Sequence, residues 1–294
     1  VRVHSFREPP VAAGGPFPVL VMRGGASGQV SRYTTLAEDL ASHGYVVVGV
    51  DAPYRTSVVA FPDGRVARRT RENDIESYPD AERASAAIRL LAAWDTDIGF
   101  TLDRLEALNR SDPSGRFAGR LDLTRAGVFG HSFGGAQAAQ FCHDDRRCRA
   151  GVDIDGRLFG SVVREGMDTP FMFLFSGRAR TAADADTRAA TDADTRQVFD
   201  EVRATYDRLP RGSRQWLFIR GANHFMYSDN GVILDGVLAR ALRLSGLFAL
   251  DPQRQLAVTA YALRVFFDAH LAPPGTAAST LLSAGYPELE PMNP

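Results

Sequence analysis

The sequence contains no lysine, so all 34 of its basic residues are arginine. Without lysine, the protein cannot form a Schiff base with pyridoxal phosphate or with a carbonyl substrate. The usual phosphate-binding P-loop and the protein kinases also require a lysine, so both classes are excluded. The chain has no basic excess either, because its formal charge is −1, and this argues against nucleic acid as a partner.

Long apolar runs are also missing: no stretch approaches the ~20 residues of a membrane-spanning helix. Cysteine is scarce, with Cys142 and Cys148 separated by polar residues that suit an exposed loop. The two are free thiols or a small disulfide; we favour the disulfide, which predicts a secreted or periplasmic protein, with a cytoplasmic one as the alternative. A metal site is not expected, because His143 and the two cysteines lack a second ligand pair.

The residues that are present have the composition of a globular domain, with 45% apolar and 23% charged. Short apolar runs alternate with helical patterns. Because these runs are apolar throughout, they predict a mostly parallel sheet covered by helices on both faces, an α/β fold. We expect strands at 17–22, 45–50, 126–130, 150–154, 170–175 and 215–219, and helices at 34–43, 82–94, 97–108, 133–142, 196–209 and 253–271. Residues 1–7 are expected to add an antiparallel edge strand.

No break in composition marks a second domain, so we expect a single domain over 1–294. Two polar segments, 56–80 and 178–197, are predicted to be excursions or lid edges. The second contains Asp-Ala-Asp-Thr-Arg twice but lacks the central glycine and closing glutamate of a calcium loop. The tail 272–294 is expected to lie extended on the surface.

One motif follows a predicted strand directly and opens a predicted helix. Residues 130–135, Gly-His-Ser-Phe-Gly-Gly, fit the G-x-S-x-G pattern of a nucleophile elbow. Such a turn strains Ser132 and exposes its hydroxyl, and Gly130 and Gly134 must be small because neighbouring backbones pass close by. The first helical amides then face the site and stabilise an oxyanion. The alternative is an ordinary capping serine, and the context favours the nucleophile.

A serine nucleophile needs a general base, for which His224 is the candidate. It follows the predicted strand at 215–219, and therefore lies after the nucleophile in the chain, as this motif requires. His131 lies inside the motif and is expected to pack beside it. Structural roles are expected for the other four histidines: His4, His43, His143 and His270.

The base in turn needs a carboxylate that holds its tautomer. Asp155 ends the predicted strand at 150–154, whereas Asp184 and Asp186 lie in the low-complexity segment after the next strand. We choose Asp155 and keep the other two in reserve. Asp153, which lies two residues earlier and inside the predicted strand, is expected to have a structural role.

The oxyanion needs two amide donors, and the first is the amide of Phe133. The second is expected from the glycine-rich loop at 23–28, after the first predicted strand. This loop lacks the G-x-G-x-x-G spacing of a dinucleotide site, so neither a nicotinamide nor a flavin cofactor is expected. Apolar walls for an acyl chain are available from Phe133, Phe159, Phe225 and Tyr227.

Six segments carry a resemblance to a known family: 40–47 (LASHGYVV), 97–105 (DIGFTLDRL), 130–135 (GHSFGG), 155–159 (DGRLF), 224–229 (HFMYSD) and 266–271 (FFDAHL). In content and order they resemble the α/β-hydrolase superfamily, and within it the plasma-type platelet-activating factor acetylhydrolases and their bacterial carboxylesterase relatives. The resemblance spans about residues 17–272. Members of the family often have His-Gly where this chain has Gly24-Gly25.

The resemblance implies Ser132 as nucleophile, Asp155 as acid, His224 as base, and the amides of Phe133 and Ala26 as the oxyanion hole. The expected activity is hydrolysis of short-acyl or lipid-like esters through an acyl-enzyme, with no cofactor or metal. Two alternatives remain open: a polyester or cutinase-type hydrolase with the same triad, and a hydrolase-like binding protein without turnover.

Overall fold

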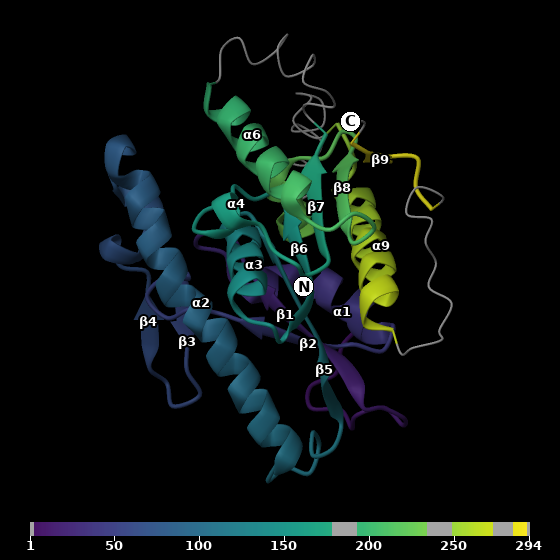
Figure 1. Ribbon diagram of the computed structural model, residues 1–294. Coiled ribbons are helices and arrows are strands. Elements are labelled where there is room, and N and C mark those ends of the chain that lie inside the picture. Colours follow the sequence, from purple (N-terminus) through teal and green to yellow (C-terminus); the bar gives the residue numbers. More distant parts are fainter. Residues whose placement is uncertain (1–2, 178–192, 234–248, 273–284, 293–294) are drawn as a thin grey trace.

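A seven-stranded sheet runs through the centre of the computed structural model, which describes residues 3–177, 193–233, 249–272 and 285–292. Its strand order is β2-β1-β5-β6-β7-β8-β9 (Figure 1). Neighbouring strands are parallel except for the last pair, β8 and β9. The strands are β1 (Phe17–Arg23), β2 (Val46–Val50), β5 (Leu121–His131), β6 (Cys148–Ile154), β7 (Phe171–Ser176), β8 (Arg214–Ile219) and β9 (Leu289–Pro291). The predicted α/β class with a mostly parallel sheet is therefore confirmed.

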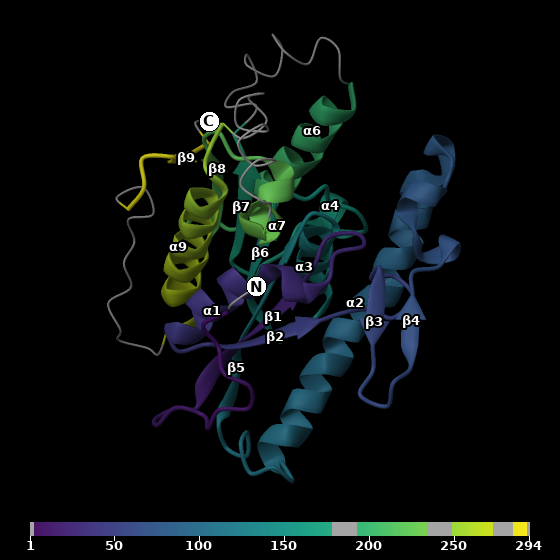
Figure 2. The ribbon, with the colours of Figure 1, turned by 180° about the vertical axis from the view of Figure 1, so that it is seen from behind.

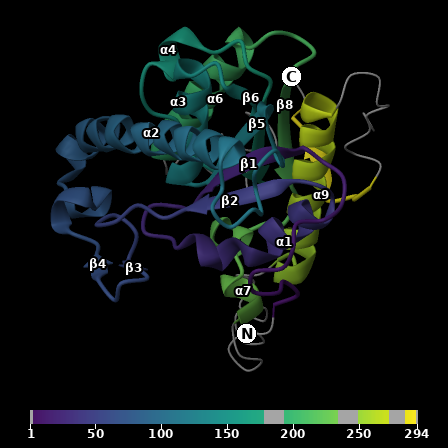
Figure 3. The same cartoon turned by 90° about the horizontal axis from the view of Figure 1, so that it is seen from below.

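Helices cover both faces of this sheet (Figures 2 and 3). Helices α1 (Thr34–Ser42) and α9 (Pro252–Leu271) pack on one face. Helices α2 (Asp80–Arg110), α3 (Phe133–Asp144) and α6 (Ala193–Arg208) pack on the other. Two short helices, α4 (Val162–Glu165) and α7 (Asn230–Ile233), lie in the connections near the carboxyl ends of the strands.

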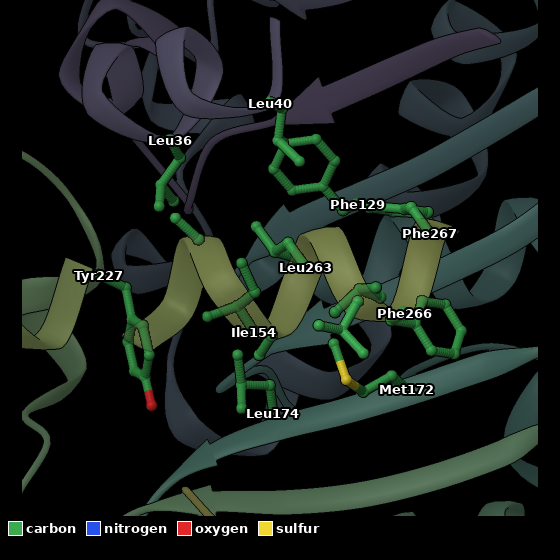
Figure 4. Packing of buried hydrophobic residues seen from close by; sticks show 14 of the residues in the cluster. Leu36, Leu40, Phe129, Ile154, Met172, Leu174, Tyr227, Leu263, Phe266 and Phe267 are labelled. Carbon is green, nitrogen blue, oxygen red and sulfur yellow. The ribbon is translucent and has the colours of Figure 1, made fainter. Parts of the chain in front are cut away.

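The continuous apolar strands are explained by this double cover. Along β1, Leu20 and Met22 join the cluster under α1 and α9, while Val19 and Val21 join the cluster under α2 and α3. Figure 4 shows the first cluster, in which Phe266 and Phe267 of α9 pack against side chains from the sheet. Because both faces of the sheet are buried, the residues that point to either side of a strand are apolar, and the strand reads as a continuous apolar run.

The two helices predicted at 82–94 and 97–108 are one continuous helix, α2. The prediction stopped at the polar residues 95–97, but Trp94 and Ile98 lie four positions apart and both are buried, so the apolar stripe continues across them. The first half of α2 packs on Phe133, and the second half packs on the sheet.

The antiparallel edge strand comes from the end of the chain rather than from its start. Residues 3–7 form no strand, so that prediction is wrong. Instead β9, within the segment expected to be an extended tail, pairs with β8 and buries Leu289. The excursion at 56–80 contains a small hairpin of β3 (Val58–Ala60) and β4 (Val66–Arg68). Residues 178–192, and with them Asp184 and Asp186, lie outside the described residues.

Cys142 and Cys148 form a disulfide, as favoured from the sequence. Their side chains are buried in the cluster under α2 and α3, however, and not exposed. The bond ties the last turn of α3 to the first residue of β6. None of the helices in the described residues is long and apolar enough to cross a membrane.

Replacing both cysteines with alanine is expected to lower the free energy of unfolding by about 2 kcal/mol, the loop-closure contribution of such a short loop. Urea unfolding followed by circular dichroism measures this loss. As a control, dithiothreitol should lower the midpoint of the wild type toward that of the double variant and leave the variant unchanged. Equal midpoints without reductant would contradict a stabilising role for the bond.

Candidate active site

Ser132 occupies a strained turn between β5 and α3. Its φ is 57° and its ψ is −125°, a conformation that non-glycine residues rarely adopt. Its side chain makes no capping hydrogen bond to the helix. Its backbone N–H donates to Ile154 O at 2.8 Å, which fixes the turn to the end of β6. The strained backbone and the lack of a capping bond are features of a nucleophile elbow and not of an ordinary capping serine.

Two glycines make this turn sterically feasible. A Cβ on Gly130 would lie 2.2 Å from Gly134 O, and one on Gly134 would lie 2.4 Å from Arg23 O. These separations are far below van der Waals contact, so neither position can accept a side chain without displacing the backbone. The first turn of α3 therefore packs directly against the backbone of β5 and against the end of β1.

Asp155 follows β6 directly and is also held at a positive φ, 56°. Its N–H donates to Leu174 O at 3.0 Å, so β7 supports the turn. The carboxylate receives hydrogen bonds from Ser176 at the end of β7: N to Oδ1 at 2.8 Å, and Oγ to Oδ2 at 2.9 Å. The sequence analysis did not identify Ser176. Its signal was a single polar residue at the end of the apolar run 171–176, on the strand that neighbours the one ending at Asp155.

His224 contacts Asp155, since its Nδ1 lies 2.9 Å from Asp155 Oδ2. It follows β8 and is anchored through its neighbour Asn223. The buried Gln255 of α9 accepts a hydrogen bond from Asn223 N and donates one to Asn223 O, at 3.0 and 2.9 Å. With Nδ1 donating to the carboxylate, the lone pair of the neutral ring lies on Nε2.

His131 brings this pair next to the elbow. Its ring centroid lies 4.6 Å from that of His224, and it directly precedes Ser132 in the chain. Burial and the neighbouring His224 lower the pKa of His131 to about 3, so its ring is neutral at working pH. A ring that stays neutral and buried is a packing element beside the elbow, as the sequence predicted.

Asp155 and Asp153 differ sharply in their surroundings. Burial opposes ionisation of Asp155, but hydrogen bonds from His224 and Ser176 outweigh it and lower the pKa of that carboxyl. Burial and the charge of Asp155 instead raise the pKa of Asp153 well above its ordinary value. Asp153 receives a bond from Gly156 N at 2.9 Å and is fully buried. Of the two, Asp155 is the carboxylate that can stabilise an imidazolium.

The loop after β1 lies against the elbow. A Cβ on Gly25 would lie 3.4 Å from Ser132 Cβ, so this loop borders the serine side chain. Gly28 N donates to Gly25 O at 3.1 Å and closes a turn around Ala26. Phe133 is the first residue of α3, and its N–H therefore has no acceptor within the helix. Both predicted oxyanion donors belong to segments that border Ser132.

The predicted apolar walls differ in their positions. Phe225 is 67% exposed and stands edge-on to the His224 ring, with centroids 5.3 Å apart. Phe159 is half-buried and packs on the buried Phe133 at 5.7 Å. Tyr227 is fully buried in the cluster under α1 and α9 (Figure 4), so its expected place in a substrate wall is wrong. It follows His224 by three residues, and the short 3₁₀ helix at 224–227 turns its ring into the core.

The described residues contain no group of three or more histidine, cysteine, aspartate or glutamate side chains arranged to hold a metal ion. The neighbouring segments described above carry a serine hydroxyl, an imidazole paired with a carboxylate, and the backbone amides of Ala26 and Phe133. This set of groups suits nucleophilic acyl transfer. In that reaction an acid orients the base, and backbone amides stabilise the oxyanion.

Comparisons with known proteins agree with this chemistry. A family model described as platelet-activating factor acetylhydrolase, isoform II, matches residues 1–273. The platelet-activating factor acetylhydrolase of Cavia porcellus is 22% identical over 272 residues, which is 84% of this chain and 56% of that protein. A probable 1-alkyl-2-acetylglycerophosphocholine esterase of Arthroderma benhamiae is 27% identical over 51% of this chain and 34% of its own length. The matches to five curated relatives, these two included, cover between 34% and 63% of their length, so the chain spans less than two thirds of each.

Among solved structures, a ferulic acid esterase from Streptomyces cinnamoneus superposes with a TM-score of 0.74. It is 29% identical, and the match covers 96% of this chain and 75% of that one. The likeness therefore extends over almost the whole α/β core.

Proposed function

Because the chain belongs to the platelet-activating factor acetylhydrolase isoform II family, we propose that it is a serine ester hydrolase acting on short-acyl or lipid-like esters. The observation that carries this proposal is the 2.9 Å contact between His224 Nδ1 and Asp155 Oδ2, with the His224 ring lying against His131, the residue before a serine held at positive φ. In this proposal Ser132 is the nucleophile, His224 the base and Asp155 the acid.

In the acylation step, Ser132 Oγ bonds to the ester carbonyl carbon while His224 Nε2 accepts the hydroxyl proton. The carbonyl oxygen becomes an oxyanion, stabilised by the amides of Phe133 and Ala26. The bond from this carbon to the alcohol oxygen then breaks, and His224 returns the proton to the leaving alcohol. The products are a free alcohol and an acyl ester on Ser132.

Deacylation reverses these roles with water. His224 removes a proton from a water molecule, whose oxygen bonds to the acyl carbon. The bond to Ser132 Oγ breaks, the serine recovers its proton from His224, and a carboxylic acid leaves. Asp155 stabilises the imidazolium in both steps, which its lowered pKa allows because it stays ionised near neutrality.

For substrate contact we propose Phe225 and Phe159. Phe225 is exposed directly beside the His224 ring, where an apolar group of the ester gains contact area. Phe159 packs on Phe133, the residue of the first oxyanion amide. For location we propose a secreted or periplasmic protein, which is supported by the disulfide between Cys142 and Cys148.

A panel of p-nitrophenyl esters tests the substrate class. We expect kcat/KM to be highest for acetyl or butyryl esters and to fall at least about tenfold by dodecanoyl, because the named relatives remove acetyl groups. An sn-2 acetyl glycerophosphocholine should be hydrolysed faster than its sn-2 palmitoyl analogue. Long-chain preference in both series would contradict the short-acyl assignment.

Two further substrates and one probe separate the alternatives. A methyl ferulate arm is included because of the likeness to a ferulic acid esterase, and a polyester film tests an open-groove hydrolase. Faster hydrolysis of either than of short soluble esters would move the proposal to that class. A fluorophosphonate probe should add its mass at Ser132, whereas a binding protein without turnover would remain unlabelled.

A further inference from the structure

Arg55 lies in the turn after β2 and is buried, with only 3% of its surface exposed. Its guanidinium lies 4.2 Å above the Trp94 ring and 5.3 Å from the Phe133 ring. Its hydrogen bonds go to three neutral oxygens: Gln137 Oε1, Gly24 O and Gly25 O, each at 3.3 Å. The last two belong to the loop that borders Ser132.

Such a buried cation is costly for the fold. Burial and the neighbouring Arg23 lower the pKa of the Arg55 guanidinium, which records how unfavourable this environment is for the charge. Apolar residues of similar volume often replace buried charges without loss of stability. An arginine placed here therefore calls for a reason other than stability.

The two carbonyls that Arg55 holds belong to successive peptide units. One nitrogen, Nη2, donates to both Gly24 O and Gly25 O, so these oxygens turn toward the same buried cation. In a trans peptide the N–H points opposite to the C=O. Fixing Gly25 O toward Arg55 therefore directs the N–H of Ala26, which shares that peptide unit, to the other side.

Tyr33 holds the same part of the loop through a backbone N–H. Its hydroxyl accepts a hydrogen bond from Gly25 N at 3.2 Å and lies 2.9 Å from Nδ1 of His131, the residue before Ser132. The Gly24–Gly25 peptide is thus held at its oxygen by Arg55 and at its nitrogen by Tyr33. Of these two peptide units, the N–H of Ala26 is the group left to face an incoming oxyanion.

We propose that Arg55, with Tyr33, is a positioning residue that presents the Ala26 amide as the second oxyanion donor. This inference rests on the proposed hydrolase function. It adds that Arg55, from the turn after β2, holds the Gly25–Ala26 carbonyl together with the N–H of Gly28 and ties the orientation of this peptide to the buried core. The charge of Arg55 also polarises this peptide and strengthens its N–H as a donor.

The test compares Arg55→Met with Arg23→Met. Arg23 is equally buried and shares the Gln137 side chain, but its remaining partners are Val50 O and the Asp97 carboxylate, and neither belongs to the loop held by Arg55. We expect Arg55→Met to lower kcat on p-nitrophenyl acetate about 10- to 100-fold with little change in KM, and Arg23→Met to lower it less than about threefold. Arg55→Lys, which can still donate to both carbonyls, should recover part of kcat.

A trifluoromethyl ketone provides the readout that a merely structural role would not change. It forms a tetrahedral oxyanion on serine, so its inhibition constant should rise by the same factor as kcat/KM falls, while the KM for substrate stays constant. Tyr33→Phe, which removes only a hydroxyl, should show the same signature and covers the case in which Arg55→Met does not fold.

The inference is overturned if the Arg55 and Tyr33 variants keep kcat within about threefold of wild type. Equal losses in Arg55→Met and Arg23→Met, or proportional changes in KM and in the inhibition constant, would also overturn it. Ser132→Ala distinguishes failure of the proposed hydrolase function from failure of the positioning role. Turnover that is retained in Ser132→Ala overturns the hydrolase mechanism. Turnover that is abolished in Ser132→Ala but normal in the Arg55 variants overturns only the positioning role.

Discussion

Replacement of Ser132 with alanine is expected to lower kcat on p-nitrophenyl acetate by at least about 10⁴-fold, because loss of a serine nucleophile removes the acyl-enzyme route. The fold should persist. The serine hydroxyl makes no capping bond, and alanine carries the same Cβ at the same positive φ. Steady-state kinetics together with loss of fluorophosphonate labelling measure the effect, and thermal melting checks the fold.

Ser132→Gly serves as the matched control. Glycine adopts a φ of 57° without steric cost, so this variant should be as inactive as Ser132→Ala but more stable by about 1 kcal/mol. Such a gain would identify the elbow as a site where conformational strain is retained for function. Turnover that survives in either variant would falsify the assignment of Ser132.

The second large effect is expected for Asp155→Asn, with a loss of about 10⁴-fold in kcat at neutral pH. Ser176 donates from both N and Oγ to the carboxylate, so the amide oxygen of an asparagine would turn toward Ser176. Its NH₂ group would then face His224 Nδ1 and force the proton onto Nε2. In that tautomer the imidazole cannot accept the proton of Ser132.

Asp153→Asn is the matched control for this substitution. Asp153 lies two residues away, is buried, and does not contact His224 in the described structure. We expect its variant to keep kcat within about tenfold of wild type. Comparable losses in the two variants would indicate a general disturbance of the β6 end, and the acid would then have to be sought elsewhere.

The two carboxyls also predict opposite pH dependences of stability. The pKa of Asp155 is lowered, so its contribution is present above the ordinary carboxyl pKa of about 3.9 and is lost as pH falls further. The pKa of Asp153 is raised, so its folded form keeps a proton and stability is lost as pH rises from about 4 toward neutrality. The difference in urea midpoint between wild type and Asp155→Asn should therefore shrink as pH falls below about 4, whereas the difference for Asp153→Asn should change as pH rises above about 4.

Local patterns were enough to predict the sheet. Runs such as residues 171–175 are apolar at every position, and both faces of the strand are indeed buried. A helix boundary was wrongly predicted inside α2 because residues 95–97 are polar, whereas the buried stripe passes from Trp94 to Ile98 on another face. β9 was missed because a three-residue strand carries almost no periodicity, and its pairing with β8 is a long-range contact.

The site could be predicted in part for the same reason. The motif around Ser132 and the strand ends at Asp155 and His224 are short-range signals, and the structure brings the last two together at 2.9 Å. Arg55 and Tyr33 carry no such signal. Their roles arise only when the β2 turn and the residues before α1 fold back on the loop at 24–28.

The short strand β9 has a consequence for the protein in concentrated solution. Without it, β8 would present unpaired N–H and C=O groups, along which a second molecule could add its own strand. β9 covers that border and ends in Pro291, which has no N–H to donate to a further strand. The strand leading to His224 is thereby shielded from the intermolecular pairing that begins fibril growth.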